Sequence, residues 1–325
     1  MSEVSFLAPG GVGRTIGYQK YYLLGLEEVT RLRVRGLPPA PGVRAKVALA
    51  YRLGRGTAEA FVGRYESGGV RFAIDGHDRR EVRDPEALAW SDVYFKANRW
   101  PGDTYDPKVL PIVNGNGLLD RRKLARLRAL RDAPKEVDVA YVSNVWGGRE
   151  HSLRVFEQLA GLDCSKDLLA IFPEGFDPSE DAENMERLRA AGVPVTREPV
   201  PPTELWRRLS RARLVPLRAG KHLCVSWRMI DLLAIGACIA YDALPPPRWP
   251  IPFEAGVHVA DCGVERPDDT EAAPEAEYEK VSRTIEALLA RPDEQTRLRT
   301  AAARYFDEHA APGRVAEYVL GLVER

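Results

Sequence analysis

The feature that most constrains the fold is a repeated alternation of short apolar runs with amphipathic helical patterns. This alternation is typical of α/β proteins with parallel sheets. It predicts a fold of doubly wound, Rossmann-like sheets. In the first part, strands are expected at 4–7, 45–51, 70–74, 93–95 and 109–113. The stretch GLPPAPG at 36–42 is expected to be a loop, because proline and glycine disfavour regular structure there.

A second alternation begins with EVDVAYVSN, after residue 135. It predicts strands at 137–142 and 168–172 and near 194, 214, 237 and 257, and helices from 149 and at 181–191, 203–210, 226–235, 272–290, 292–308 and 314–323. We therefore expect two domains, 1–135 and 136–325, with a last helix that can return to the first domain. In open α/β sheets ligands bind beyond the carboxyl ends of the strands, so the two domains are expected to face a cleft.

Charge and composition exclude some partners. The 325 residues hold 47 basic and 47 acidic side chains, and this balance gives no electrostatic case for nucleic acid. The basic stretch DRRKLARLRALR at 120–131 has leucines every three residues, which favours an amphipathic helix over a polyanion or anionic-membrane patch. Peripheral membrane contact is therefore not indicated.

Location and metal content also have sequence signals. The amino terminus lacks the pattern of a secretory signal, and the apolar run LLAIGACIAY at 232–241 is too short to span a bilayer. We expect a soluble, cytoplasmic protein. Its four cysteines lie far apart, which argues against a zinc site or redox motif, so no metal is expected.

The stretch APGGVGRTIGYQKYYLL at 8–24 raises the question of a phosphate-binding P-loop. A Walker loop needs lysine before its Ser or Thr, and here Arg14 precedes Thr15; its first glycine is replaced by Ala8. Arginine's rigid fork does not replace that lysine without a change of geometry. An ATPase built on this loop is kept only as an alternative.

The most informative segment runs from residue 201 to 261. A helix ending in SRAR leads to the strand LVPL, then to a loop with Arg218, Gly220 and Lys221; the next helix carries Arg228 and Asp231 near its start and ends at Gly236, before the strand CIAYD. This pattern resembles the donor half of GT-B glycosyltransferases, specifically the group-1-like C-terminal domains.

Further segments carry the same resemblance. DVAYVSNVWGGREHSLRVFEQL is similar to the family's first donor-domain strand, glycine loop and helix-starting arginine, which implies donor contacts at Asn144, Gly147, Gly148 and Arg149. SDVYFKANRW and KVLPIVNGNG are similar to segments that close the acceptor domain, which implies an acceptor contact at Lys96. The resemblance spans about residues 68–262. Many relatives carry glutamate where Asp231 stands, so its implied ribose contact involves a shorter side chain.

The implied reaction explains these residue types. When a nucleotide-sugar donor reacts, negative charge gathers on the departing diphosphate. Arginine, lysine and helix N-termini can neutralise that charge without a metal, and Arg218, Lys221 and Arg228 cluster where the resemblance places the diphosphate. Simpler readings stay open: Arg218 and Lys221 can be solvated loop cations, and Arg228 with Asp231 an ordinary ion pair on a helix.

The first half offers a candidate base. In FAIDGHDRR a predicted strand runs out into Asp75, His77 and Asp78, at the end where ligands bind. A transferase that inverts configuration needs a base for the acceptor's proton, and flanking carboxylates can fix the tautomer of a histidine and raise its pKa. The alternatives are a purely structural turn, or a retaining enzyme that needs no such base.

The glycine-rich stretch can then belong to an acceptor domain, with Gly11 and Gly13 allowing close backbone approach and Arg14 contacting phosphate or acceptor; a structural turn is the alternative. We expect a glycosyltransferase whose partners are a nucleotide sugar, used as co-substrate without any cofactor, and a glycan or small-molecule acceptor. The other hypotheses are the P-loop ATPase, a non-catalytic sugar-nucleotide or glycan-binding protein, and a nucleotide-sugar epimerase of the same architecture.

Overall fold

The structure is a computed structural model of the chain, and it describes residues 2–7, 12–35, 61–145, 149–173, 178–245, 249–265 and 272–325, without the side chains of 12–16, 149, 178, 179 and 221. The chain divides into two compact units. The first comprises Met1–Ala125, Pro246–Pro252 and Phe306–Arg325, and the second comprises Arg126–Pro245 and Phe253–Tyr305. The change of unit thus falls earlier than residue 135, and the last helix belongs with the first unit.

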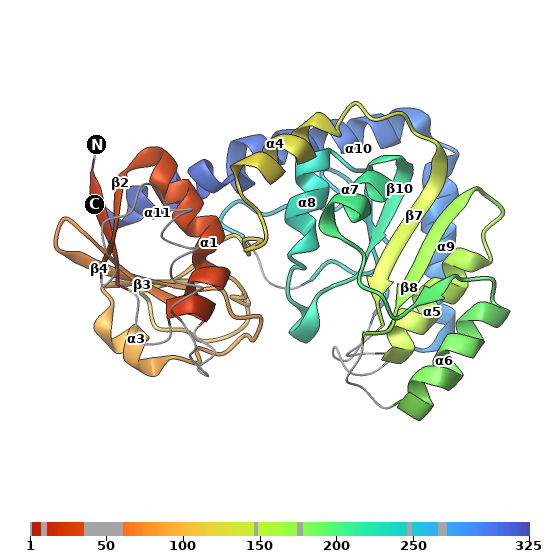
Figure 1. Cartoon of the computed structure of the whole chain (residues 1–325), viewed down its shortest axis with the longest axis horizontal. Coiled ribbons are helices and arrows are strands. Elements are labelled where there is room, and N and C mark those ends of the chain that lie inside the picture. Colours follow the sequence, from red (N-terminus) through yellow and green to blue (C-terminus); the bar gives the residue numbers. More distant parts are fainter. Residues whose placement is uncertain are drawn as a thin grey trace. The chain divides into compact units, whose positions relative to one another are not determined.

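The first unit contains a six-stranded sheet in the order β2-β1-β3-β4-β5-β6 (Figure 1). Its strands are β1 (Glu3–Leu7), β2 (Arg31–Arg35), β3 (Val62–Ser67), β4 (Val70–Asp75), β5 (Val93–Lys96) and β6 (Val109–Pro111). Strand β3 is antiparallel to both neighbours, and the other pairs are parallel. The tight β3–β4 hairpin turns through Gly68 and Gly69, whose positive φ angles of 57° and 88° suit glycine. The expected strand at 45–51 and loop at 36–42 lie outside the described residues.

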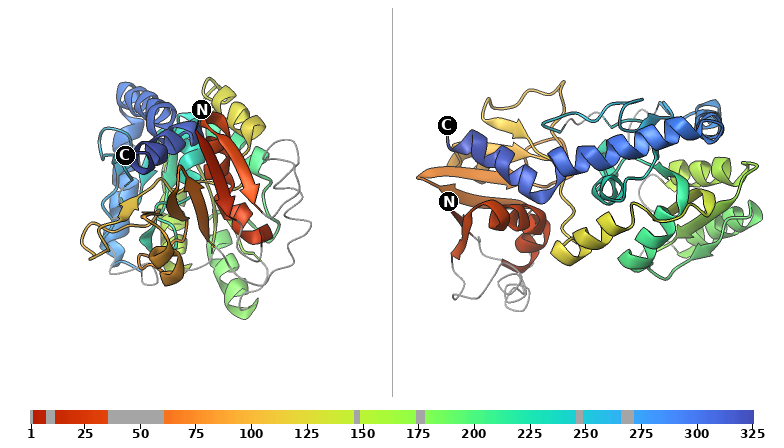
Figure 2. Two further views of the ribbon diagram at one scale, coloured as in Figure 1. Left: turned by 90° about the vertical axis from the view of Figure 1, so that its left-hand side faces the viewer. Right: turned by 90° about the horizontal axis from the view of Figure 1, so that it is seen from above.

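Helices α1 (Val12–Val29), α3 (Pro85–Trp90) and α11 (Pro312–Val323) belong to the first unit, and α4 (Arg121–Ala129) spans its boundary. Helix α11 follows a π-helical turn, Phe306–Ala310, and packs against α1 (Figure 2). The approach is close at Gly25, where an added Cβ would lie 2.0 Å from the backbone oxygen of Pro312. The hydroxyl of Tyr21 also donates to the backbone oxygen of Ala310. These contacts hold the carboxyl-terminal helix in this unit.

Aromatic packing forms much of the first unit's core. The ring of Tyr65 stacks on Phe72 with centroids 5.1 Å apart and contacts Phe6 at 4.9 Å, and all three side chains are fully buried. Gln19 is buried beside them; its amide donates to the backbone oxygens of Phe61 and Ile74 and accepts from the Tyr65 hydroxyl. Gln19 therefore ties α1 to the underside of the β3–β4 hairpin.

The second unit contains an all-parallel six-stranded sheet in the order β12-β11-β10-β7-β8-β9. Its strands are β7 (Val137–Asn144), β8 (Lys166–Ile171), β9 (Val195–Thr196), β10 (Ala212–Leu217), β11 (Ile239–Tyr241) and β12 (Ala260–Asp261). Its helices are α5 (Arg149–Ala160), α6 (Pro178–Ala190), α7 (Pro202–Ser210), α8 (Arg228–Ile235), α9 (Glu275–Leu289) and α10 (Pro292–Tyr305). Apolar side chains from the strands and helices form one buried core. The strand order reverses between β7 and β10, and this switch point is where open α/β sheets bind ligands.

Candidate functional site

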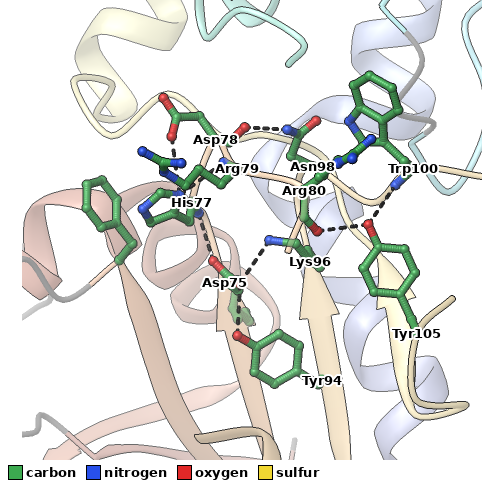
Figure 3. A network of polar contacts seen from close by, with 12 residues as sticks. Asp75, His77, Asp78, Arg79, Arg80, Tyr94, Lys96, Asn98, Trp100 and Tyr105 are labelled. Atoms are coloured by element: carbon green, nitrogen blue, oxygen red, sulfur yellow. Dashed lines mark hydrogen bonds and ion pairs between the residues drawn. The ribbon is translucent and has the colours of Figure 1, made fainter. Parts of the chain in front are cut away.

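The carboxyl ends of β4 and β5 carry a buried polar cluster in the first unit (Figure 3). The Asp75 carboxylate accepts from the Tyr94 hydroxyl at 2.8 Å and from Lys96 Nζ at 3.1 Å. The side chains of Asp75 and Lys96 are fully buried. Burial, together with the carboxylate of Asp75, raises the pKa of Tyr94 well above its usual value. In this arrangement Asp75 and Lys96 stabilise the strand ends, while more exposed groups beyond them are the ones that can meet a ligand.

His77 lies in the turn that follows, where its Nδ1 has two neighbours. The backbone N–H of Arg79 donates to Nδ1 at 3.0 Å, and Asp78 Oδ1 lies 3.2 Å from the same nitrogen. An N–H donor can bond Nδ1 only when that nitrogen is unprotonated, so the neutral ring carries its proton on Nε2. A proton on Nδ1 would instead be donated to Asp78. The turn is held from below by the His77 N–H, which donates to Asp75 Oδ1 at 2.8 Å.

The loop beyond β5 contributes the rest of this cluster. The Asn98 amide donates to the backbone oxygen of Asp78, and the guanidinium of Arg80 lies over the Trp100 ring, 5.3 Å from its centroid. Figure 3 marks the Asn98 hydrogen bond with a dashed line and draws Arg80 beside Trp100. Of the other acceptor residues expected from the sequence, Gly11 lies outside the described residues, and Gly13 and Arg14 lie in the first turn of α1, where side chains are not described.

A second group of residues gathers at the carboxyl edge of the parallel sheet in the second unit. Arg218 follows β10, and its guanidinium donates to the backbone oxygen of Asn144 at 3.2 Å and to Ser143 Oγ at 3.5 Å. Arg228 is the first residue of α8, and its guanidinium donates to the backbone oxygen of Val142. Residues 142–144 are the end of β7, so one strand end anchors both arginines.

These two arginines are half-buried cations held close together. Burial lowers the pKa of Arg228 from its usual value; Tyr141 and Asp231 oppose the shift, and the nearby charge of Arg218 adds to it. Among residues with described side chains, neither guanidinium forms an ion pair with a carboxylate. The free energy of two desolvated positive charges falls when an anion binds between them. The arrangement is therefore suited to an anion with several oxygen atoms.

The other expected donor residues are placed as follows. Asp231 lies in the first turn of α8, is buried, and accepts a hydrogen bond of 2.9 Å from Trp206 Nε1. Arg149 begins α5 and Lys221 lies in the turn after β10, both without described side chains, and Gly147 and Gly148 lie outside the described residues. The structure thus anchors Arg218 on Asn144 and Arg228 on Val142, both at the end of β7.

The turn between the two arginines is tight. The Gly220 N–H donates to the backbone oxygen of Cys224 at 2.8 Å, and a Cβ at Gly220 would lie 2.6 Å from Cys224 Sγ, so a side chain there would require Cys224 to move. His222 and Leu223 adopt positive φ angles of 57° and 51°, which are costly for residues with a Cβ. Such strain is often found at ligand-binding turns.

Sequence reasoning missed three buried residues at this edge: Ser143, His151 and Asp242. Asp242 directly follows β11, and its Oδ2 lies 2.6 Å from His151 Nε2. Asp242 could have been found as an acidic residue at a strand's carboxyl end, as Asp75 was. His151 has no comparable signal, because its partner is 91 positions away.

The described part of the chain holds neither a metal-binding cluster nor a membrane-spanning helix. No group of three or more His, Cys, Asp or Glu side chains there is arranged to hold a metal ion. Among those same residues, no helix has the length and apolar character needed to cross a membrane.

Several solved structures match this chain at low sequence identity. A glycosyltransferase from Rickettsia africae ESF-5 is 12% identical, with 99% of this chain and 96% of that chain covered and a TM-score of 0.52. Sucrose-phosphate synthase from Thermosynechococcus elongatus is 13% identical over 74% of this chain and 60% of its own, with a TM-score of 0.48. Anabaena HepE in complex with UDP and glucose is 11% identical over 72% of this chain and 63% of its own, with a TM-score of 0.47.

The Rickettsia structure matches over nearly the whole chain, and it confirms the GT-B fold expected from the sequence resemblance. No protein-family model and no curated protein sequence matches the chain.

Proposed function

We propose that the chain is a glycosyltransferase that moves a sugar from a nucleotide-diphosphate sugar to a hydroxyl group of a glycan or small molecule, without a metal ion. The observation that carries the proposal is the pair Arg218 and Arg228, two half-buried guanidinium groups anchored on the end of β7. Neither guanidinium forms an ion pair with a carboxylate among the described side chains, and both lie at the edge where α/β sheets bind ligands. The GT-B fold supports the same reading.

The proposed reaction gives these cations their task. The acceptor oxygen bonds to the anomeric carbon while the bond from that carbon to the diphosphate oxygen breaks. The nucleoside diphosphate leaves with an additional negative charge. Arg218, Arg228 and the N-terminus of α8 would stabilise that charge most strongly in the transition state, which is the requirement for rate enhancement.

The remaining donor contacts complete the proposed site. Lys221 would add a third cation from the tight turn, and Asp231 would accept from the ribose hydroxyls. The backbone at Gly147 and Gly148, with Asn144 and Arg149, would approach the donor from the β7–α5 connection. We assign no residue to a metal, because charge stabilisation is given to the cations.

In the first unit, His77 is the proposed base and Asp78 its partner. The form able to accept a proton at Nε2 carries a proton on Nδ1, and Asp78 Oδ1, 3.2 Å away, would accept that hydrogen bond. This tautomer requires the Arg79 N–H to leave Nδ1, so the turn would adjust as the base engages. Asp75 would hold the turn and Lys96 would hold Asp75, both as positioning residues. Gly11, Gly13 and Arg14 would lie along the acceptor.

The test is turnover of a panel of nucleotide sugars in EDTA, with release of nucleoside diphosphate measured in the presence of candidate acceptor mixtures. We expect release with one donor, with the sugar recovered on an acceptor by mass spectrometry. His77→Ala should then lower kcat with little change in the donor KM. Donor binding without release of nucleoside diphosphate would indicate a non-catalytic binding protein. ATP hydrolysis that requires Mg²⁺ would favour the alternative ATPase.

A further inference from the structure

A buried hydrogen-bond chain in the second unit connects helices α9 and α5 to the carboxyl end of β11. The backbone N–H of Ala273 donates to the Tyr278 hydroxyl at 3.0 Å, and that hydroxyl lies 2.9 Å from His151 Nδ1. His151 Nε2 lies 2.6 Å from Asp242 Oδ2. Asp242 Oδ1 accepts from the Ala243 N–H at 2.7 Å. His151 and Tyr278 are fully buried and Asp242 is 3% exposed.

With His151 neutral and Asp242 ionised, the protons in this chain have one arrangement. An ionised carboxylate can only accept, so the proton between His151 and Asp242 is on Nε2. A neutral imidazole then has a lone pair on Nδ1, which accepts from the Tyr278 hydroxyl. The Tyr278 oxygen accepts from the Ala273 N–H through a lone pair, which is compatible with its own O–H donating to His151. When His151 is neutral, its tautomer is thus fixed from α9, and both oxygens of the Asp242 carboxylate accept from N–H donors.

Asp242 in turn fixes the backbone on both sides of Arg218. Its own N–H donates to the backbone oxygen of Leu217 at 2.9 Å, and its Oδ1 accepts from the Ala219 N–H at 3.2 Å. The β10–β11 ladder ends at Leu217 and Tyr241. The hydrogen bonds of Asp242 therefore hold the backbone one to two residues beyond the last strand pair. Arg218 is the residue enclosed between these two hydrogen bonds.

We propose that His151 is a positioning residue for anion binding: by holding the Asp242 carboxylate it fixes the backbone that aims Arg218 at the diphosphate. This inference rests on the proposed function, because it takes Arg218 to be a diphosphate ligand. His151 touches no substrate in this account. It acts through Asp242, and a flexible Arg218 would bind the same anion with a larger entropic cost.

Two amide variants separate this role from simple packing. In His151→Gln the amide nitrogen can stand about where Nε2 stands and still donate to Asp242. In His151→Asn, one methylene shorter, the amide reaches about as far as Nδ1 and cannot donate to Asp242. The two variants share polarity and chemistry, so a difference between them reports the bond to Asp242.

The first readout is the affinity for inorganic pyrophosphate, measured by calorimetry in EDTA. We expect His151→Asn to weaken binding about tenfold, the effect of losing one charge-assisted hydrogen bond, and His151→Gln to stay within about twofold of wild type. The second readout is amide hydrogen exchange at Ala219 and Ala243, which needs no ligand. Exchange should become faster in His151→Asn and stay near wild type in His151→Gln.

Wild-type affinity and unchanged exchange in folded His151→Asn would overturn the proposal. If His151→Asn does not fold, His151→Gln still decides: a folded Gln variant with a tenfold loss of affinity contradicts the role given to Nε2. The wild type can also fail to bind pyrophosphate while amide exchange is still faster in His151→Asn than in His151→Gln. That result would support the effect on the loop, but it would overturn the proposed donor site and the role of His151 in anion binding.

Discussion

The carboxylate of Asp231 accepts a hydrogen bond of 2.9 Å from the indole nitrogen of Trp206. Asp231 lies on α8, three residues after Arg228, and Trp206 reaches it from α7. Both side chains are buried, and a buried carboxylate requires donors. The residue proposed to bind ribose therefore also joins two helices, and its two roles can be separated by the choice of ligand.

Asp231→Asn should weaken the binding of a nucleoside diphosphate but not that of inorganic pyrophosphate, because only the nucleoside diphosphate carries ribose hydroxyls. Because a charged acceptor is lost, the affinity for the nucleoside diphosphate should fall roughly tenfold. Calorimetry with both ligands measures this. Trp206→Phe is the control, since it removes the indole donor but keeps the carboxylate. Equal losses for the two ligands in Asp231→Asn would show a disturbed helix instead of a ribose contact.

Arg218→Ala and Arg228→Ala should each lower the affinity for pyrophosphate by about 10- to 100-fold, as expected for charge-assisted hydrogen bonds in a half-buried site. Arg207→Ala is the matched control: Arg207 lies on α7 and pairs with Glu204 at 2.6 Å on the surface. It should bind like wild type. An equal effect of all three substitutions would point to general charge attraction.

Removing one partner of the Lys96–Asp75 ion pair should destabilise the protein more than removing both. Lys96→Met leaves a buried carboxylate with fewer donors, and about 3–5 kcal/mol of unfolding free energy should be lost. Adding Asp75→Leu should recover part of this loss, because the double variant buries no unpaired charge. Urea unfolding of the two single variants and the double variant measures the coupling. Additive losses would mean that the two charges do not interact.

Lys135 predicts a pH dependence of stability. Burial and the nearby charge of Arg299 lower its pKa to about 8 from 10.5. Between these values the unfolded chain holds a proton that the folded protein has released, so unfolding free energy should rise with pH. Below about pH 8 both states are charged, and above 10.5 both are neutral. The difference in urea stability between Lys135→Met and wild type should therefore shrink from pH 7.5 to 10; a constant difference contradicts this.

The second sheet was predictable from the sequence because its strands are apolar runs bounded by loops. The expected strand at 137–142 is β7 (Val137–Asn144), and that at 168–172 is β8 (Lys166–Ile171). In the first unit, β2 (Arg31–Arg35) and β3 (Val62–Ser67) were missed. The β2 sequence RLRVR alternates charged with apolar residues on a sheet edge, and only Val34 is buried, so no apolar run marks it. The β3 sequence VGRYES likewise contains no apolar run.

The candidate site was predictable where residues follow strands or begin helices. Arg218, Arg228 and Asp75 all have such positions. Their hydrogen-bond partners were not predictable. The bond from Arg228 to the backbone of Val142, for example, joins positions 86 apart, and no local sequence pattern indicates such a contact. The same reason hid His151, which meets Asp242 only through the packing of α5 against the sheet.

The central claim is a metal-independent diphosphate site at Arg218 and Arg228. Its most direct test is the melting temperature of the purified protein with nucleoside diphosphates, nucleotide sugars and ATP, in EDTA and then in Mg²⁺. A ligand of the folded state raises the melting temperature by mass action. We predict stabilisation by one nucleoside diphosphate in EDTA that is lost in Arg228→Ala. Stabilisation only by ATP with Mg²⁺, or by none of the ligands, would contradict the account.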